Sequence, residues 1–250
     1  MKKWMIVSPL IVLVLWQVLA SAGALGKATP SPVQVAQGLY QLTVTGFPPG
    51  YRLLGHLLAS LARVLLGFGI AVVLAVPLGI LMGFSPRFRT VVDPLIEVIR
   101  PVPPLAWLPL ALIWFGIGYI SAAFMIFLGV FFPVVLNTVS GVRSVDPYMV
   151  EAARTLGADN KTILVKVLVP GSLPSIFTGI RVGMGIGWMT LVAAELTGVK
   201  SGYGLGYMIM SAFDVARYDY IVAGIVVIGL IGFLLDRLIK VAEKRLLRWR

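Results

Sequence analysis

Ionisable residues occur inside apolar stretches of this sequence, where a charge is costly and is therefore a candidate for function. Arg63 and Glu195 fall near the ends of such stretches, and Arg181 falls about 13 Å into one. An arginine in an apolar path attracts small anions, and Glu195 would pair with an arginine or shape an outer gate. The alternative is snorkelling, in which the arginine head reaches the nearest interface. We favour snorkelling for Arg63 and leave both readings open for Arg181.

Other chemistry is scarce in this chain. The absence of cysteine excludes disulfides, thiolate metal sites and cysteine nucleophiles. The single histidine, His56, cannot form a His-rich metal site or a histidine relay. No convincing Ser/His/Asp set is present, and no stretch fits the phosphate-binding pattern G-x4-G-K-[ST]. We therefore predict no catalytic residue, no metal site and no cofactor, and any ATP would be hydrolysed by a partner protein.

The elements that must position these residues are membrane helices. Of the 250 residues, 59% are hydrophobic and 12% are charged, about half the charged fraction of a soluble domain. A spanning helix needs about 20 apolar residues. Six segments meet this length: Trp4–Leu25, Leu57–Phe84, Val91–Phe115, Tyr119–Val142, Ser172–Leu196 and Tyr220–Ile239. The fold class that follows is an all-α integral membrane protein with about six transmembrane helices.

The segment Val91–Phe115 is the least uniform of the six. It begins with charged residues and contains the proline cluster Pro101–Pro104. A continuous α-helix cannot hold that cluster, because proline lacks the amide hydrogen and clashes with the preceding turn. We predict a helix that enters obliquely from the membrane surface and is broken at these prolines.

The net charge of +11 reflects topology. With the N-terminus inside, most of the 21 lysines and arginines lie on the cytoplasmic side, as the positive-inside rule requires. Both termini are then cytoplasmic, and nucleic-acid binding has no support. Lys2 and Lys3 followed by Ala20-Ser21-Ala22 also resemble a cleavable secretory signal. We favour an uncleaved first helix, because its apolar run is longer than a typical signal core.

No internal repeat divides the chain, so residues 1–250 are predicted to form one transmembrane domain. An external segment, about residues 26–56, is expected to carry a surface helix near 32–45. The opposite, cytoplasmic side carries a charged loop, about residues 143–170.

The first half of this charged loop predicts a short helix. Asp146-Pro147 is a typical helix start, in which aspartate caps free amides and proline occupies the first helical position. The helix would run over Tyr148–Leu156 and end at Gly157, the residue that most readily adopts a left-handed terminus. Small side chains at Ala152 and Ala153 would let another protein approach the backbone closely.

The second half of the loop predicts another helix. Asp159 or Asn160 would cap it, and it would continue through Val169 and end at Pro170. One face would be an apolar stripe, formed by Ile163, Leu164, Val167 and Leu168, opposite Lys161 and Lys166. Two short helices at a sharp turn would make a rigid knob.

The loop resembles the EAA loop of ABC importer permeases. Their pattern, EAA-x3-G-x9-I-x-L-P, aligns with Glu151-Ala152-Ala153, Gly157 and Val167-x-Val169-Pro170, with valine as a mild departure at two positions. Three further blocks resemble the nitrate/sulfonate/taurine/bicarbonate branch of that family: residues 100–118, 131–138 and 179–195. Tyr119 departs from the acidic residue that the family would place after Gly118.

The resemblance implies a type I ABC importer permease (MetI-like) fold and a transport subunit that is not itself an enzyme. The same resemblance implies a location in the bacterial cytoplasmic (inner) membrane. It also implies cytoplasmic ABC ATPase subunits, a second permease copy that is identical (a homodimer) and an extracytoplasmic solute-binding protein as partners. The solute would be a small anion such as nitrate, sulfonate, taurine or bicarbonate. The residues that would couple the permease to the ATPase are Glu151, Ala152, Ala153, Leu156, Gly157 and Pro170.

The translocation pathway is predicted with less support. The candidate residues are Pro104, Trp107, Arg181, Trp188 and Glu195, although the two tryptophans are more often packing or interfacial residues. An ion-coupled secondary carrier or channel is the alternative function. It would need acids deep in the spans to couple protons or sodium, and none was identified there.

Overall fold

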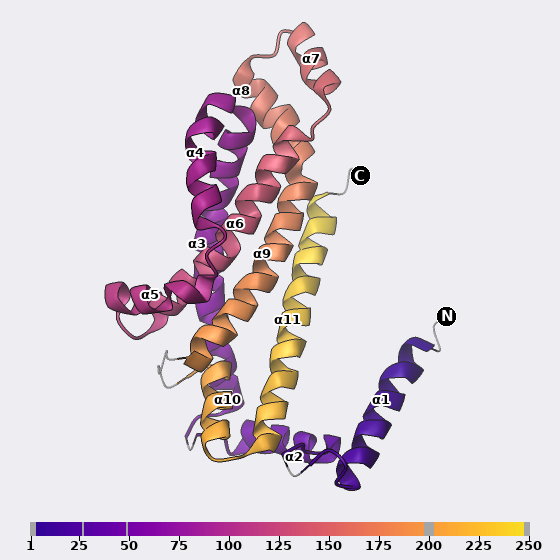
Figure 1. Cartoon of the computed structure of the whole chain (residues 1–250). Coiled ribbons are helices and arrows are strands. Elements are labelled where there is room, and N and C mark those ends of the chain that lie inside the picture. Colours follow the sequence, from indigo (N-terminus) through magenta and orange to yellow (C-terminus); the bar gives the residue numbers. More distant parts are fainter. Residues whose placement is uncertain (1–3, 27, 49, 198–202, 248–250) are drawn as a thin grey trace. The chain divides into compact units, whose positions relative to one another are not determined.

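The protein is described by a computed structural model that covers residues 4–26, 28–48, 50–197 and 203–247. All regular elements in these ranges are helices. In chain order they are α1 (Trp4–Ser21), α2 (Pro32–Val44), α3 (Leu53–Phe84), α4 (Pro86–Ile99), η1 (Pro104–Trp107), α5 (Leu108–Phe115), α6 (Tyr119–Arg143), α7 (Pro147–Thr155), α8 (Asn160–Ile163), η2 (Leu164–Leu168), α9 (Val169–Thr197), α10 (Leu205–Asp214) and α11 (Tyr218–Leu246) (Figure 1).

Four of these helical segments are long and apolar enough to cross a membrane, and a fifth span is formed by a bent pair. The four are Leu53–Phe84, Tyr119–Arg143, Asn160–Leu196 and Tyr218–Leu246. The all-helical membrane fold is confirmed, with four or five spans among the described residues rather than the predicted six. The sixth predicted span corresponds to α1, an apolar helix of 18 residues. The helix ends there because Gly23 and Gly26 adopt positive φ angles of 72° and 78°.

The bent pair confirms the predicted break. Helix α4 and the helical stretch Pro104–Phe115 meet at an angle of 84°. Ser85 caps α4 by accepting a hydrogen bond from the Phe88 amide, and Pro103 precedes the 3-10 turn η1. The segment turns where prolines remove the amide hydrogens that a continuous helix needs.

The chain divides into two compact units. The first comprises Met1–Ser60 and Lys200–Ile231, and the second comprises Leu61–Val199 and Gly232–Arg250. Helices α3 and α11 contribute residues to both.

In the first unit, α2 confirms the helix predicted near residues 32–45. A capping box begins it, in which Ser31 and Gln34 exchange side-chain to backbone hydrogen bonds. Gln41 of α2 accepts hydrogen bonds from the Arg217 guanidinium and the Tyr220 hydroxyl, both at 2.9 Å. These bonds hold α2 against the start of α11.

The single histidine of the chain is a structural residue of the first unit. His56 is fully buried. Its Nδ1 accepts a hydrogen bond from the Gly204 amide at 3.1 Å, and its Nε2 lies 3.1 Å from the Phe47 carbonyl oxygen. Ser60 accepts a bond from the next amide, Leu205. Histidine and serine from α3 therefore satisfy amides at the start of α10, which would otherwise lack partners.

The second unit is organised around α6 and α9, which run side by side (Figure 1). Glycines in α9 allow the close approach. A side chain at Gly187 would begin 2.6 Å from Val130, and one at Gly179 would begin 2.7 Å from Asn137, both in α6. The glycine-rich stretch of α9 is thus explained by helix packing, as small residues allow in membrane proteins.

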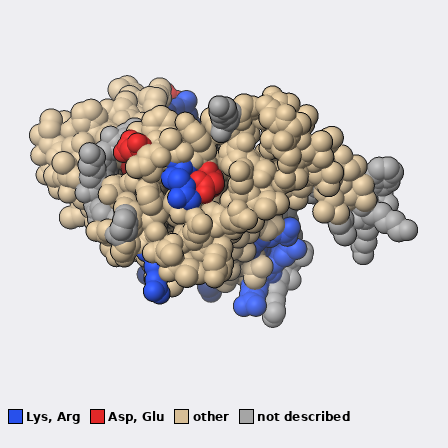
Figure 2. All heavy atoms as spheres, turned by 90° about the horizontal axis from the view of Figure 1, so that it is seen from below, with Lys and Arg blue, Asp and Glu red and all other residues tan. Residues whose placement is uncertain are grey.

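Charged residues are sparse on much of the surface. Figure 2 shows a face on which uncharged residues predominate and lysine, arginine, aspartate and glutamate occur only in small groups. Long apolar side chains such as Val73 in α3 and Ile225 in α11 are well exposed. Such an apolar exterior suits a lipid environment.

Candidate functional site

The predicted helix at the charged loop is present as α7, between α6 and α8 (Figure 1). Asp146 caps it by accepting a hydrogen bond from the Tyr148 amide at 2.9 Å. At the other end Gly157 has a φ of +82°. The Gly157 amide donates to the Arg154 carbonyl at 2.9 Å, and the Ala158 amide donates to the Ala153 carbonyl at 3.0 Å. This pair of bonds is the Schellman motif, so both ends of α7 are fixed by local hydrogen bonds.

The inner side of α7 rests on a small apolar cluster. Val142, Ile163 and Leu168 are buried, and Val150 and Ala153 of α7 pack against them. The methyl group of Ala153 therefore faces the protein's own cluster. Ala152 and Glu151 are exposed.

The outer side of α7 presents large apolar side chains to solvent. Tyr148 is 78% exposed, Met149 is 61% exposed and Leu156 is 88% exposed. A nine-residue helix with no buried residue of its own, two large exposed apolar groups and a third at its C-cap, Leu156, is suited to contact another protein. Glu151 lies on the same short helix and is exposed.

The second helix of the loop begins as predicted. Asp159 caps α8 by accepting a hydrogen bond from the Thr162 amide at 3.0 Å. Hydrogen bonding from Thr162 lowers the pKa of the Asp159 carboxyl below its ordinary value. The apolar stripe is confirmed, since Ile163 and Leu168 are buried while Lys161 and Lys166 are exposed.

The predicted end of that helix at Pro170 is wrong. The chain continues from α8 through the π-helical turn η2 directly into α9. In η2 the Val169 amide donates to the Leu164 carbonyl. This wider turn immediately precedes Pro170, where a regular α-helix would force the proline ring against the preceding turn. The loop and the long span α9 are therefore joined by one continuous helical path.

The prediction that Arg63 snorkels is wrong. Arg63 and Glu195 form a buried ion pair at 2.6 Å, with side chains 4% and 1% exposed. The pair joins α3 to α9. Pairing with an arginine was one of the two roles predicted for Glu195. The partner of Arg63 was not identified from the sequence, because it lies 132 residues away along the chain.

Arg181 of α9 is also ion-paired. Its Nε lies 3.2 Å from Asp236 Oδ1, and its Nη1 lies 3.9 Å from Glu243 Oε2. Asp236 also pairs with Lys240 at 2.6 Å. Asp236, an acid within the predicted span Tyr220–Ile239, was not predicted as the partner of Arg181. These contacts brace α9 against α11.

The predicted tryptophans have different positions. Trp188 is buried and packs at Gly232, where an added side chain would begin 3.2 Å from the indole ring. Trp107 is half-buried at the end of η1. Trp188 is therefore a packing residue in this structure.

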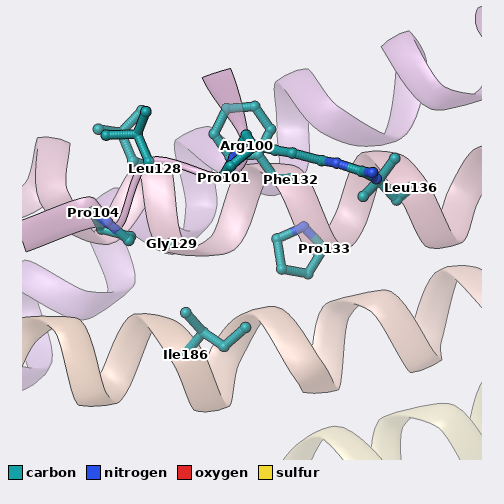
Figure 3. A pocket seen from close by; sticks show the side chains of 10 residues that line it. Arg100, Pro101, Pro104, Leu128, Gly129, Phe132, Pro133, Leu136 and Ile186 are labelled. Atoms are coloured by element: carbon teal, nitrogen blue, oxygen red, sulfur yellow. The ribbon is translucent and has the colours of Figure 1, made fainter. Parts of the chain in front are cut away.

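A cavity of about 520 Å³ lies beside the break between α4 and η1. Pro104 lines it, together with Arg100, Pro101, Val102, Leu128, Gly129, Phe132, Pro133, Leu136 and Ile186 (Figure 3). The walls come from the break, from α6 and from α9. From the sequence, Arg100 is predicted only as one of the arginines on the cytoplasmic side. The signal that marks it is its position as the last residue before the proline cluster.

Metal binding is not indicated by the described residues, among which no group of three histidine, aspartate or glutamate side chains lies close enough to share an ion.

Comparison with known proteins identifies the family. The sequence model of one protein family, described as "binding-protein-dependent transport system inner membrane component", matches residues 75–248. A putative ABC transporter permease protein of Methanocaldococcus jannaschii is 46% identical over 198 residues, which cover 79% of this chain and 74% of the relative. The taurine transport system permease protein of Escherichia coli is 44% identical over 223 residues, covering 88% and 79% respectively. The nitrate import permease protein of Synechocystis is 37% identical over 239 residues, covering 93% and 85%.

The fold comparison agrees. The chain resembles a chain of the MetNI methionine ABC transporter in an inward-facing conformation, with a TM-score of 0.62 and 22% identity, covering 78% of this chain and 94% of that one. This similarity confirms the MetI-like fold. With four to five apolar spans, a matching fold and a family match over most of its length, the chain is an integral membrane permease that belongs to the inner membrane components of binding-protein-dependent transport systems.

Proposed function

We propose that this chain forms the transmembrane pathway of an ATP-driven importer for a small anion and receives the driving force through α7. The observation that carries the coupling role is the construction of α7, which is capped at both ends and exposes Tyr148, Met149 and Leu156. A stiff helix with an apolar outer face can transmit a push from a partner, whereas a flexible loop would absorb it.

The partners follow from this role. They are cytoplasmic ATPase subunits at α7, an extracytoplasmic solute-binding protein and a second, identical permease copy. The chain itself would hydrolyse no ATP and would need no cofactor of its own. It would lie in the cytoplasmic membrane with both termini and α7 inside.

The names of the relatives support an anion as the transported solute. They are named for transport of taurine, aliphatic sulfonates, nitrate and bicarbonate, at 33% to 44% identity. Taurine carries a sulfonate, and the other named solutes are anions. Anionic solutes are therefore the common feature of this branch.

The coupling residues of the proposal are those with exposed positions in α7 and its end: Glu151, Ala152, Leu156 and Gly157. Ala153 supports α7 from inside, and Pro170 lies on the helical path into α9. Among the predicted pathway residues, Pro104 lines the cavity and Trp107 ends the same short helix η1. Arg181, Trp188 and Glu195 have packing or ion-pair contacts, so we assign them a supporting role.

The alternative, an ion-coupled carrier, is less well supported. Such a carrier would use acids in the spans to bind and release protons or sodium ions. Glu195 and Asp236 are each ion-paired with an arginine, which leaves them poorly placed for that cycle.

The proposal is tested by purifying the tagged chain in mild detergent from its native membrane. We expect a stoichiometric P-loop ATPase to co-purify, and Glu151→Arg to remove it and abolish anion uptake while membrane insertion is kept. The matched control is Asp214→Arg, a charge reversal at an exposed acid at the end of α10. It should retain the ATPase. Full uptake by Glu151→Arg, or transport in vesicles without ATP, would contradict the proposal.

A further inference from the structure

The cavity beside the helix break contains one charged residue. Of the ten residues that line it, nine are apolar, proline or glycine, and the tenth is Arg100. Arg100 is the cap residue that ends α4. Figure 3 shows its side chain extending from the break towards Leu136 of α6.

Arg100 has no neutralising partner in the part of the chain that the structure describes. Among the described residues, no carboxylate forms an ion pair with it. In a second cavity, by contrast, Arg89 is paired with Asp93 at 3.0 Å. Arg63 and Arg181 are likewise paired. Arg100 therefore keeps its full capacity to bind an anion from solution.

The rest of the cavity is a poor environment for a small, fully hydrated anion. Leu128, Phe132 and Leu136 line it from α6, and Ile186 projects into it from α9 (Figure 3). Pro101 and Pro104 have no amide hydrogen to offer. The Arg100 guanidinium thus offers several hydrogen-bond donors at the edge of an otherwise apolar cavity.

We infer that Arg100 holds the oxyanion head of the transported solute and that the apolar walls select a monoanion with a short hydrocarbon tail. The planar guanidinium binds two oxygens of such a head at once. The tail would cover Phe132, Leu136 and Ile186, whereas nitrate or bicarbonate would leave these side chains in contact with water. This inference rests on the proposed anion transport and adds the residue and the tail selectivity.

The test is calorimetric titration of the assembled permease–ATPase complex in lipid nanodiscs, without the solute-binding protein. The probes are sodium nitrate, methanesulfonate and butanesulfonate. We expect the affinity to rise by up to about fourfold for each added methylene that is buried. Butanesulfonate should therefore bind more tightly than methanesulfonate, and nitrate should bind most weakly.

Three variants separate the contributions. Arg100→Gln should weaken butanesulfonate binding by about tenfold or more, since it removes a charge-assisted bond. Arg87→Gln is the matched control, because Arg87 is an exposed arginine of the same helix that does not line the cavity. It should bind like the wild type. Leu136→Asn should reduce the difference between butanesulfonate and methanesulfonate and leave nitrate binding nearly unchanged.

Unchanged binding in Arg100→Gln, equal affinities for nitrate and butanesulfonate, or no binding of either by the wild type would overturn the inference. ATP-dependent anion uptake by the wild-type complex with its binding protein, reconstituted in vesicles, is measured in parallel. If uptake is present while any of these results is found, only the inference fails. If uptake is absent for all anions, the proposed function fails with it.

Discussion

Helix α7 and the α6–α9 pair are rigid for opposite reasons. Helix α7 has no buried residue and depends on hydrogen-bonded caps and on two side chains that rest on a small cluster. The α6–α9 pair depends on tertiary contact, with small residues that bring the two backbones close. The difference shows how one chain separates a surface for a partner from a scaffold. The outer face of α7 can change without loss of the fold, whereas the α6–α9 contact cannot.

The largest change in stability is expected when the buried ion pair between α3 and α9 is broken. Glu195→Ala should lower the free energy of unfolding by about 3–5 kcal/mol, because it leaves the buried charge of Arg63 without its carboxylate partner. Denaturant unfolding in detergent micelles measures it. On α7, Glu151→Ala should change the free energy by less than about 0.5 kcal/mol.

The double variant Arg63→Met/Glu195→Leu sharpens this result. It removes both charges at once, so most of the lost stability should return. A Glu195→Ala protein as stable as the wild type would mean that the ion pair does not hold the scaffold together.

The next effect tests the glycine contact itself. Gly187→Leu should destabilise the protein by about 1–3 kcal/mol through overpacking, because the added side chain would begin 2.6 Å from Val130. Gly185→Leu is the matched control on the same helix, since nothing lies within 4 Å of an added Cβ there. Melting temperatures of the two purified variants give the comparison. Equal melting temperatures would show that α6 and α9 do not approach closely at Gly187.

Gly157 is needed for its backbone conformation, whereas Gly187 is needed for close packing. Nothing lies within 4 Å of an added Cβ, and only its φ of +82° opposes a side chain. Gly157→Ala should therefore cost about 1–2 kcal/mol locally, and Gly157→Asn should cost less because asparagine tolerates this conformation. Hydrogen exchange in the peptide that spans α7 is the measurement. If alanine and asparagine exchange alike and like the wild type, α7 does not need its left-handed end.

The smallest effect is expected at the cap of α8. Hydrogen bonding from Thr162 lowers the pKa of the Asp159 carboxyl in the folded protein. The contribution of the cap to folding stability is therefore fully present above pH 3.8, the ordinary pKa of the carboxyl. This contribution is lost as the pH falls from 3.8 through the lower pKa that the carboxyl has in the folded protein. Exchange at the Thr162 amide should rise slightly in Asp159→Ala at pH 7. A pH titration of α8 helicity should show no loss between pH 8 and pH 5.

Local features were predicted well from the sequence. The caps at Asp146, Gly157 and Asp159 and the break near Pro103 depend on residues a few positions apart, and all are present in the structure. The end of the second loop helix at Pro170 was not predicted correctly. A proline usually ends a helix, but the π turn that precedes this one allows the helix to continue, and such a turn has no strong sequence signal.

The ion pairs could not be predicted in the same way. The segments that carry Arg63 and Glu195 were visible as spans, but hydropathy does not say which spans touch. The same limit hid the contacts of Arg181 with Asp236 and Glu243 on α11. Arg100 was counted only among the cytoplasmic arginines, because its position relative to α6 depends on the 84° bend.

By itself, the sequence determined the membrane class, most spans, the capped helix of the loop and the family resemblance. These properties follow from short-range rules, namely hydrophobic length, capping residues and motif spacing. Only the tertiary structure decided which charges are neutralised. Arg63 and Arg181 meet carboxylates on distant helices, whereas Arg100 faces apolar walls without a carboxylate partner among the described residues. Whether a charge is free to bind a solute depends on which helices meet, and that is a property of packing.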